Sequence, residues 1–598
     1  MPAPRIQIQD VSPQVDCGRY PAKATLGDRV PVAATIFRDG HDVLRASIRH
    51  RPAGTRRWHE APLEAVGNDR WEGSFVPDLL GRHELRVQAW VDPYATWLGE
   101  VDRKVAAGQV DLAGELAEGE ALFGPGAVER WRAAAAALSQ KQRHDPAQSV
   151  VLRVDIEREL ARFGAWYELF PRSWGGFRGV SAVLPELAAL GFDVVYLPPV
   201  HPIGLTSRKG RNNAGRAGKS DPGSPWAIGA AAGGHDALHP DLGTDADFDA
   251  MVAAARAAEV ELALDFAIQC SPDHPWLSEH PEWFQRRPDG SIKVAENPPK
   301  RYDDIHNVDW ETADREGLWH ALRDVVLHWC RRGIRVFRVD NPHTKPVPFW
   351  EWLIAQVRLE YPDTVFLAEA FTRPAPMTTL AKIGFGQSYT YFTWKNTKAE
   401  LVELIEQMRS WSACYRPNLW PNTPDILHAF LQEGGRPAFE ARLVLAATLS
   451  PSYGIYSGYE ACEHVPLRAG SEEYLGSEKY EVKQRRLEGP LLPLIRRLNE
   501  IRRAHPALQR FENLVWLETQ SDDLIAYAKV EAGDTVVVVV NLDPFAEREG
   551  LCIVPGTLGL PAAFEAADLL AGSTFRWRTG RNYVRLAAGG AHVLVVRG

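Results

Sequence analysis

The most constraining feature of the sequence is a series of short apolar segments that alternate with helical stretches between about residues 162 and 456. Each apolar segment has the length of one buried strand, and each intervening stretch can hold the helix that a parallel connection requires. This alternation is typical of βα units, and eight such units close into a (β/α)8 barrel. The predicted strands are 164–169, 192–197, 260–266, 334–339, 365–368, 388–392, about 418–420 and about 452–456.

Two consecutive predicted strands lead directly into an acid. Residues 334–339 precede Asp340, and Arg338 stands two positions before that acid. Residues 365–368 precede Glu369. The carboxyl ends of barrel strands line the active face, so the two acids are expected to meet there. Either acid alone could simply cap the helix that follows its strand. Two in succession, with an arginine beside the first, favour the paired carboxylates of a sugar-cleaving site.

The pattern of apolar and polar residues changes along the 598 residues of the sequence, which indicates several domains. The expected fold class is therefore multidomain α/β. Alternating apolar and polar residues between turn signals indicate a β-sandwich at the start, and an Ala- and Glu-rich stretch around 128–138 predicts a helical insert. The predicted parts are 1–103 (N-terminal β-sandwich, with a return strand at 149–156), 104–148 (helical insert), 160–505 (barrel, with a loop subdomain at about 270–310) and 506–598 (C-terminal antiparallel β-domain).

Charge and composition limit the partners. A formal net charge of −9 argues against nucleic acid, and no apolar run approaches the roughly 18 residues of a membrane helix. Six scattered cysteines without a CxxC pair are typical of reduced thiols and not of a disulfide frame or a zinc site. We also see no signal peptide and no cluster of oxygen ligands for calcium. The sequence predicts a cytoplasmic protein with no metal and no other cofactor.

Several motifs resemble the α-amylase superfamily, glycoside hydrolase family 13. The conserved acids of that superfamily match Asp340, Glu369 and Asp425. Neighbouring motifs narrow the resemblance to the maltose-1-phosphate maltosyltransferases of α-glucan synthesis, and the likeness covers nearly the whole chain, including the order of its parts. These motifs are 197–204, 208–213, 264–275, 295–302, 388–394 and 477–480.

The resemblance implies a role for each acid. Asp340 would be the nucleophile, Glu369 the proton donor and then the base, and Asp425 the group that stabilises the transition state. Retaining enzymes hold the first two carboxyl groups about 5–5.5 Å apart. Arg338 would keep Asp340 ionised by charge pairing. Asp425 follows a Thr-Pro turn, so it could instead be a helix N-cap.

The resemblance also implies a binding site for a sugar phosphate, α-maltose 1-phosphate. A phosphate dianion needs hydrogen-bond donors, and the predicted loops at the barrel mouth supply them. Lys209 and its neighbours could alternatively form a solvated, flexible loop. The expected substrate-binding residues are Lys209, Asn213, Gln269, Asn297, Lys300, Tyr302, Asp304, Arg338, Asn341, Lys479 and Tyr480.

The sequence therefore predicts a retaining glycosyltransferase. It would move maltosyl units from α-maltose 1-phosphate to the non-reducing end of a maltooligosaccharide or α-1,4-glucan acceptor, with release of phosphate. Cys270 and Pro424 stand where amylases have histidines, which makes starch hydrolysis a weaker expectation. An amylase-type hydrolase, a trehalose synthase or a branching enzyme could use the same acids, and a non-catalytic glycan-binding scaffold remains a third reading. A homodimer is implied by the resemblance alone.

Overall fold

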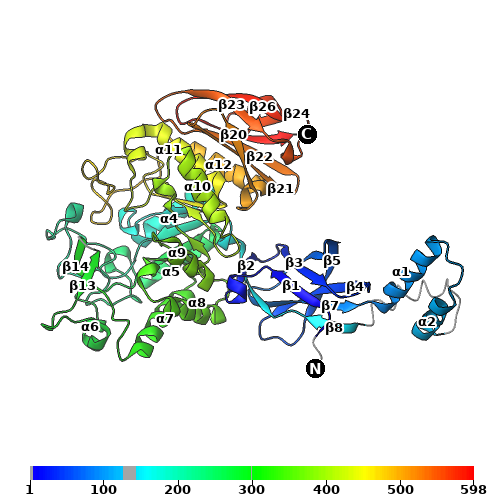
Figure 1. Ribbon diagram of the computed structural model, residues 1–598. Coiled ribbons are helices and arrows are strands. Elements are labelled where there is room, and N and C mark those ends of the chain that lie inside the picture. Colours follow the sequence, from blue (N-terminus) through cyan, green and yellow to red (C-terminus); the bar gives the residue numbers. More distant parts are fainter. Residues whose placement is uncertain (1–3, 125–142, 298–299, 598) are drawn as a thin grey trace. The chain divides into compact units, whose positions relative to one another are not determined.

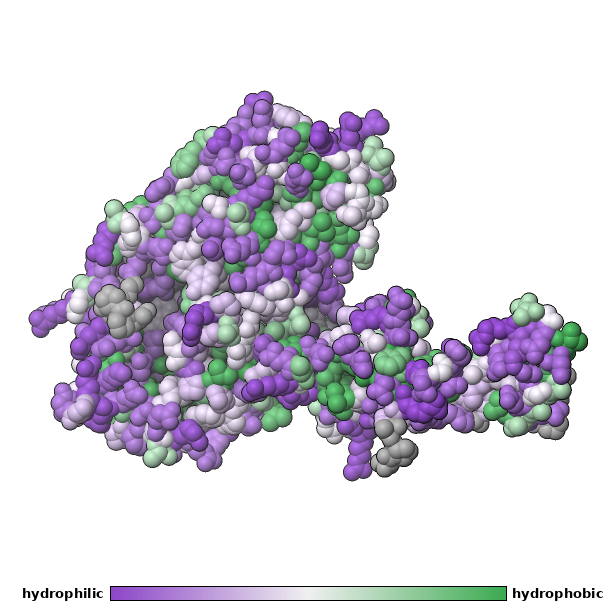
Figure 2. Space-filling view, viewed as in Figure 1, coloured by the Kyte–Doolittle hydropathy of each residue, from purple (hydrophilic) through white to green (hydrophobic). Residues whose placement is uncertain are grey.

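The computed structural model describes residues 4–124, 143–297 and 300–597, so the predicted helical stretch 128–138 lies outside the described residues. The chain forms two compact units, Met1–Arg158 and Glu159–Gly598. In the view of Figure 2, hydrophilic residues cover most of the visible surface of each unit. In the part of the chain that the structure describes, no helix has both the length and the apolar character needed to cross a bilayer.

The first unit is built on one hydrogen-bonded series of strands, β1-β3-β6-β5-β4-β7-β9-β2, with β8 added beside β7 (Figure 1). β1 also approaches β7, so the sheet folds over a common core that includes Val32, Ile48, Leu85 and Val154. The strands are β1 (Gln7–Ser12), β2 (Ala22–Thr25), β3 (Val30–Phe37), β4 (Leu44–Pro52), β5 (His59–Gly67), β6 (Arg70–Phe75), β7 (Gly81–Val91), β8 (His144–Gln148) and β9 (Leu152–Glu157).

The first helix after β7 begins at Pro93, before the predicted start of the helical insert at 104. Helix α1 spans Pro93–Ala106 and α2 spans Ala113–Phe123, so the helical region does not begin at about 104. The cause is local: the Asp92 side chain accepts a hydrogen bond from the Ala95 N–H at 2.9 Å, and proline is well suited to the first turn that follows such a cap. The end of the predicted insert is also corrected, because residues 144–148 form a strand.

The second unit contains the predicted (β/α)8 barrel. Its parallel strands lie in the order β17-β16-β15-β12-β11-β10-β19-β18, and a parallel bridge between Ser388 and Pro417 closes the ring. The predicted strand 388–392 is shorter than expected, because residues 391–394 form a 3-10 turn capped by the Thr390 side chain. The strands are β10 (Gly164–Glu168), β11 (Val194–Leu197), β12 (Glu261–Phe266), β15 (Val336–Val339), β16 (Val365–Ala368), β17 (Gln387–Ser388), β18 (Asn418–Leu419) and β19 (Ser452–Tyr456).

Helices surround this barrel (Figure 1), and each of them buries several apolar side chains. Two of them begin with a capping box, in which a threonine and an acid three residues later satisfy each other's backbone N–H groups. The helices are α4 (Gly176–Ala189), α5 (Asp245–Ala257), α7 (Arg315–Arg331), α8 (Val347–Glu360), α9 (Pro374–Ile383), α10 (Lys398–Arg409), α11 (Ala429–Leu449) and α12 (Leu492–Ala504). Helix α6 (Trp276–Glu279) and the hairpin β13 (Val294–Asn297) and β14 (Lys300–His306) lie in the long loop after β12.

The interior of the barrel changes from apolar to charged along the strands. Trp166, Val194, Ala263, Val336 and Leu367 belong to one buried cluster. Side chains alternate between the two faces of a strand, so the residue two positions after an interior residue also points inward. This rule places an acid or an arginine in the barrel mouth after four of these residues: Glu168 after Trp166, Asp265 after Ala263, Arg338 after Val336, and Glu369 after Leu367.

The C-terminal part of the second unit is an antiparallel sheet in the order β25-β24-β27-β22-β21-β20-β23-β26. Its core includes Leu517, Val539, Phe564, Trp577 and Leu594. The strands are β20 (Leu514–Thr519), β21 (Leu524–Glu531), β22 (Asp534–Asn541), β23 (Arg548–Val554), β24 (Ala563–Asp568), β25 (Thr574–Arg578), β26 (Gly580–Leu586) and β27 (Ala591–Arg597).

A buried lysine joins this sheet to the barrel. Lys529 on β21 is fully buried, and its Nζ donates to the carbonyl oxygens of Leu449, at the end of α11, and of Arg510, at 3.3 and 2.5 Å. Burial lowers the pKa of Lys529 to about 7.

We predict that Lys529 makes the stability of this unit pH-dependent. The unfolded chain holds the Lys529 proton up to a pKa of about 10.4, and the folded chain only up to about 7, so stability rises with pH between these values. The free energy of unfolding rises by on the order of 1.4 kcal/mol for each unit by which the two pKa values differ. Lys529→Met should flatten this rise, as measured by urea unfolding at pH 6.5 and 9.5. The exposed control Lys219→Met should keep the wild-type slope. An equally steep rise in Lys529→Met would contradict the assignment.

Candidate active site

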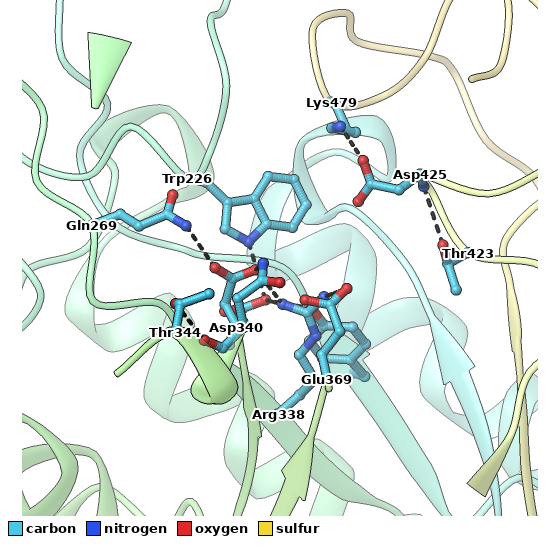
Figure 3. Close-up of polar contacts among 12 residues, drawn as sticks. Trp226, Gln269, Arg338, Asp340, Thr344, Glu369, Thr423, Asp425 and Lys479 are labelled. Atoms are coloured by element: carbon cyan, nitrogen blue, oxygen red, sulfur yellow. Dashed lines mark hydrogen bonds and ion pairs between the residues drawn. The ribbon is translucent and has the colours of Figure 1, made fainter. Parts of the chain in front are cut away.

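One guanidinium joins three carboxylates at the mouth of the barrel (Figure 3). Arg338 Nη1 donates to Asp265 Oδ2 at 2.7 Å and to Asp340 Oδ1 at 3.0 Å, and Nη2 forms an ion pair with Glu369 Oε1. All four side chains are buried. The structure thus brings the two acids predicted from strands 334–339 and 365–368 to a single cation.

The register of the barrel places these groups. Asp265 on β12 lies beside Arg338 on β15, and the ladder continues one residue beyond each of two strand ends. The Asp340 N–H donates to the Phe266 carbonyl oxygen at 3.1 Å, and the Glu369 N–H donates to the Val339 carbonyl oxygen at 3.0 Å. The backbone of both acids is therefore fixed by the neighbouring strand and does not depend on a loop.

Burial and nearby charges shift the pKa values of Asp340 and Glu369 in opposite directions. Burial raises the pKa of Glu369 well above its usual range, and outweighs the opposing charge of Arg338. Burial acts in the same direction on Asp340, but there the positive charges of Arg338 and Lys345 win and the pKa is lowered. These opposite shifts favour the carboxylate form of Asp340 and the protonated form of Glu369, which is the combination that a nucleophile and a general acid need. Glu369 Oε2 has no hydrogen-bond partner among the described residues, so this oxygen can carry the proton.

Two amides orient the Asp340 carboxylate. Gln269 Nε2 donates to Oδ2 at 2.6 Å, and Asn341 Nδ2 donates to Oδ1 at 3.3 Å. Asn341 adopts a left-handed backbone conformation, with φ of 43°, which asparagine tolerates better than most residues. Gln269 and Asn341, both predicted from the sequence, thus contact the Asp340 carboxylate.

The third acid, Asp425, lies across the opening from this cluster, where its Oδ1 pairs with Lys479 Nζ (Figure 3). Its backbone N–H donates to Thr423 Oγ1 at 3.2 Å. The N-cap of the following helix, α11, is His428, whose ring accepts from the Phe430 N–H. Asp425 is therefore not the cap of that helix, and its carboxylate stays available beside Lys479.

Four further predicted residues lie close to this pair. Asp304 and Tyr480 are buried, and Lys209 is only 9% exposed, although residues 211–216 of the same loop are exposed. Burial raises the pKa of Asp304 against the opposing charges of Lys209 and Lys479. Burial also raises the pKa of Tyr302, and the charges of Lys479 and Asp425 act on it. These groups can offer hydrogen bonds and charge to a ligand.

Of the remaining three predicted residues, only Asn213 has a side chain that the structure describes. Asn213 is exposed on a turn at residues 211–213, with a left-handed φ of 62°. Asn297 and Lys300 pair with each other at the tip of the β13–β14 hairpin, and their side chains lie outside what the structure describes.

Other residues of the site were missed from the sequence. Asp265 accepts hydrogen bonds from Tyr196 OH at 2.5 Å and from Trp226 Nε1 at 3.3 Å, as well as from Arg338. Lys345 Nζ donates to the carbonyl oxygens of Asp340 and Asn341, each at 3.2 Å. The two-residue alternation within 260–266 could have identified Asp265 as inward-facing, whereas no sequence pattern pairs Tyr196 or Trp226 with it.

A buried cluster of His235, Cys270 and His274 has the spacing of a metal site. Its hydrogen bonds argue otherwise. The Trp276 N–H donates to His274 Nδ1 at 3.1 Å, so the neutral ring carries its proton on Nε2, which lies 3.0 Å from His235 Nδ1. His235 Nε2 in turn lies 2.9 Å from the Ala267 carbonyl oxygen. The imidazoles thus satisfy each other, and burial raises the pKa of the Cys270 thiol, so these groups do not fit a metal.

The barrel, with acids at the carboxyl ends of its strands, places the protein in the class with the α-amylase fold. A maltogenic α-amylase from Thermotoga neapolitana aligns with a TM-score of 0.59 and 17% identity over 73% of this chain and 99% of that chain. An α-amylase from Lactobacillus plantarum aligns with a TM-score of 0.58 and 21% identity over 73% and 100% of the two chains. At these identities the likeness shows the fold alone.

Closer relatives identify the family. The chain is 50% identical to α-1,4-glucan:maltose-1-phosphate maltosyltransferase 2 of Streptomyces coelicolor, over 99% of this chain and 96% of that protein. It is 46% identical to the enzyme of the same name from Mycolicibacterium smegmatis, over 99% and 97%. Family models for domain N/S of these maltosyltransferases and for the C-terminal domain of GlgE match residues 4–165 and 516–596. The chain belongs to the α-1,4-glucan:maltose-1-phosphate maltosyltransferase family.

We predict that Glu369 sets the basic limb of the pH profile. Activity needs the protonated acid, whose pKa burial raises, so kcat/KM should fall as pH rises through that pKa. Glu369→Gln should lower kcat by about 10²–10⁴-fold and remove the basic limb from the residual rate. The measurement is the initial rate of donor cleavage from pH 5 to 10. The exposed control Glu360→Gln, at the end of α8, should leave both unchanged. A basic limb that persists in Glu369→Gln would assign it to another group.

Proposed function

We propose that this protein transfers maltosyl units from α-maltose 1-phosphate to the non-reducing end of α-1,4-glucans and releases phosphate. The observation that carries the proposal is the pairing of Asp340 and Glu369 on one guanidinium, in a chain whose full-length relatives are named maltosyltransferases.

In the first step, an Asp340 carboxylate oxygen attacks the anomeric carbon of the maltosyl group. The bond between that carbon and the phosphate oxygen breaks, and Glu369 gives its proton to the leaving phosphate. The products are a β-maltosyl-enzyme and inorganic phosphate. Arg338 holds both carboxyl groups in place, so its part in the reaction is to position the acids and not to bind the phosphate directly.

In the second step, Glu369 is a carboxylate and takes the proton from the 4-hydroxyl of the acceptor. The acceptor oxygen attacks the anomeric carbon and displaces Asp340, which returns to its ionised form. Two inversions give an α-1,4 linkage, so the configuration of the donor is retained.

The groups opposite the acid pair are the proposed donor site. Asp425 would hold sugar hydroxyls and stabilise the oxocarbenium-like transition state. The cations Lys209 and Lys479 would favour the phosphate dianion. The remaining proposed contacts are Asn213, Gln269, Asn297, Lys300, Tyr302, Asp304, Asn341 and Tyr480. We further propose that the enzyme works in the cytoplasm as a homodimer, on the strength of the sequence resemblance.

The test is phosphate release. Purified enzyme with α-maltose 1-phosphate should release inorganic phosphate many-fold faster when a maltooligosaccharide is added, and the oligosaccharide should grow by two glucose units at a time. Asp340→Asn should abolish both, because the amide cannot form the glycosyl-enzyme. Growth by single glucose units, or reducing-sugar release from starch without phosphate release, would contradict the proposal and support another family 13 reaction.

A further inference from the structure

A further carboxyl group, that of Glu168, faces the mouth of the barrel. Glu168 is the last residue of β10 and lies beside Tyr196 on β11 and Tyr456 on β19. Trp166, two positions earlier, belongs to the interior cluster, so the Glu168 side chain also points inward. It is only 2% exposed. The sequence motifs did not single out this residue, and the mechanism above does not use it.

The Glu168 carboxyl group has no hydrogen-bond partner among the residues that the structure describes. Its neighbours are committed elsewhere: Tyr196 OH donates to Asp265, and Tyr456 OH donates to Glu478. Only the backbone carbonyl oxygen of Glu168 is engaged by a loop, since it accepts from the Ser457 N–H at 2.9 Å. A buried polar group left without a partner costs about 1–3 kcal/mol. Such a cost is common at binding sites, where the ligand supplies the missing partner.

The position of Glu168 at the inward-facing end of β10 brings it under the influence of the site's charged groups. Burial raises the pKa of Glu168 well above its usual range, and the nearby charges that act on it include Arg338, Asp425 and Glu369. The group thus lies among the charged side chains at the mouth of the barrel, in the same sheet as the strands that carry Asp265 and Arg338. As a neutral carboxylic acid it offers one donor and one acceptor, which matches a sugar hydroxyl group.

We propose that Glu168 is a further donor-binding residue, whose carboxyl group exchanges hydrogen bonds with a hydroxyl of the glucosyl ring that Asp340 attacks. This inference rests on the proposed maltosyl transfer. It adds to that reaction a residue at the end of β10 that fixes the ring between Asp340 and Asp425.

The experiment compares stability with donor use in three variants. Glu168→Leu removes the hydrogen bonds and the buried polar group, Glu168→Gln keeps a donor and an acceptor, and Glu460→Leu is the matched control. Glu460 is equally buried, but its carboxylate accepts from Tyr167 OH at 2.8 Å and from the Gly458 N–H at 3.1 Å. Thermal midpoints, kcat and KM for α-maltose 1-phosphate are measured for each full-length protein.

Glu168→Leu should lower kcat/KM by about 10–100-fold, which corresponds to the loss of one or two hydrogen bonds at about 1.4 kcal/mol per tenfold change. Its thermal midpoint should equal or exceed that of the wild type, whereas Glu460→Leu should lower the midpoint. Glu168→Gln should keep kcat/KM within a few-fold of the wild type.

Unchanged kcat/KM in Glu168→Leu, or a fall in its thermal midpoint like that of Glu460→Leu, would overturn the proposal. A wild-type enzyme that fails to release phosphate from α-maltose 1-phosphate would instead refute the proposed function. The two failures are therefore distinguishable.

Discussion

The ion cluster around Arg338 is the interaction on which the rest of the site depends. Removing a charged group from water costs several kcal/mol, and three carboxylates together would also repel one another. The guanidinium offsets these costs because its fixed geometry reaches Asp265, Asp340 and Glu369 at once. The acids can be buried side by side only because this cation lies among them.

The same cluster explains why two similar acids play different parts. The ionised form of Asp340 is stabilised more strongly, because Lys345 lies near it and two amides donate to its carboxylate. Glu369 holds one oxygen on the arginine and leaves the other without a partner in the described structure. Positive charge therefore favours ionisation of Asp340, whereas burial favours protonation of Glu369. Chemistry that needs a base and an acid at one pH follows from this asymmetry.

Much of the fold could be read from local pattern. Eight apolar segments between helices predicted a closed barrel, and the strand ends predicted where Asp340 and Glu369 would meet. The predicted boundaries were wrong where local hydrogen bonds set the backbone conformation against the pattern of apolar and polar residues. Asp92 starts a helix in a region read as sandwich, and Thr390 turns the chain out of a strand after two residues. Side-chain caps of this kind act within a few residues and leave little trace in hydrophobic periodicity.

The sequence by itself indicated the barrel and the strand ends that carry Asp340 and Glu369, because strand periodicity and strand ends are local properties of the chain. The resemblance of its motifs indicated the family. Only the tertiary structure decided which distant groups share the site. The pairs Asp425–Lys479 and Asp265–Tyr196 join loops and strands far apart in the chain, and the burial of Glu168 without a partner follows from what its neighbours bind. Closure of the barrel brings these side chains together, since burial and electrostatic coupling depend on three-dimensional distance.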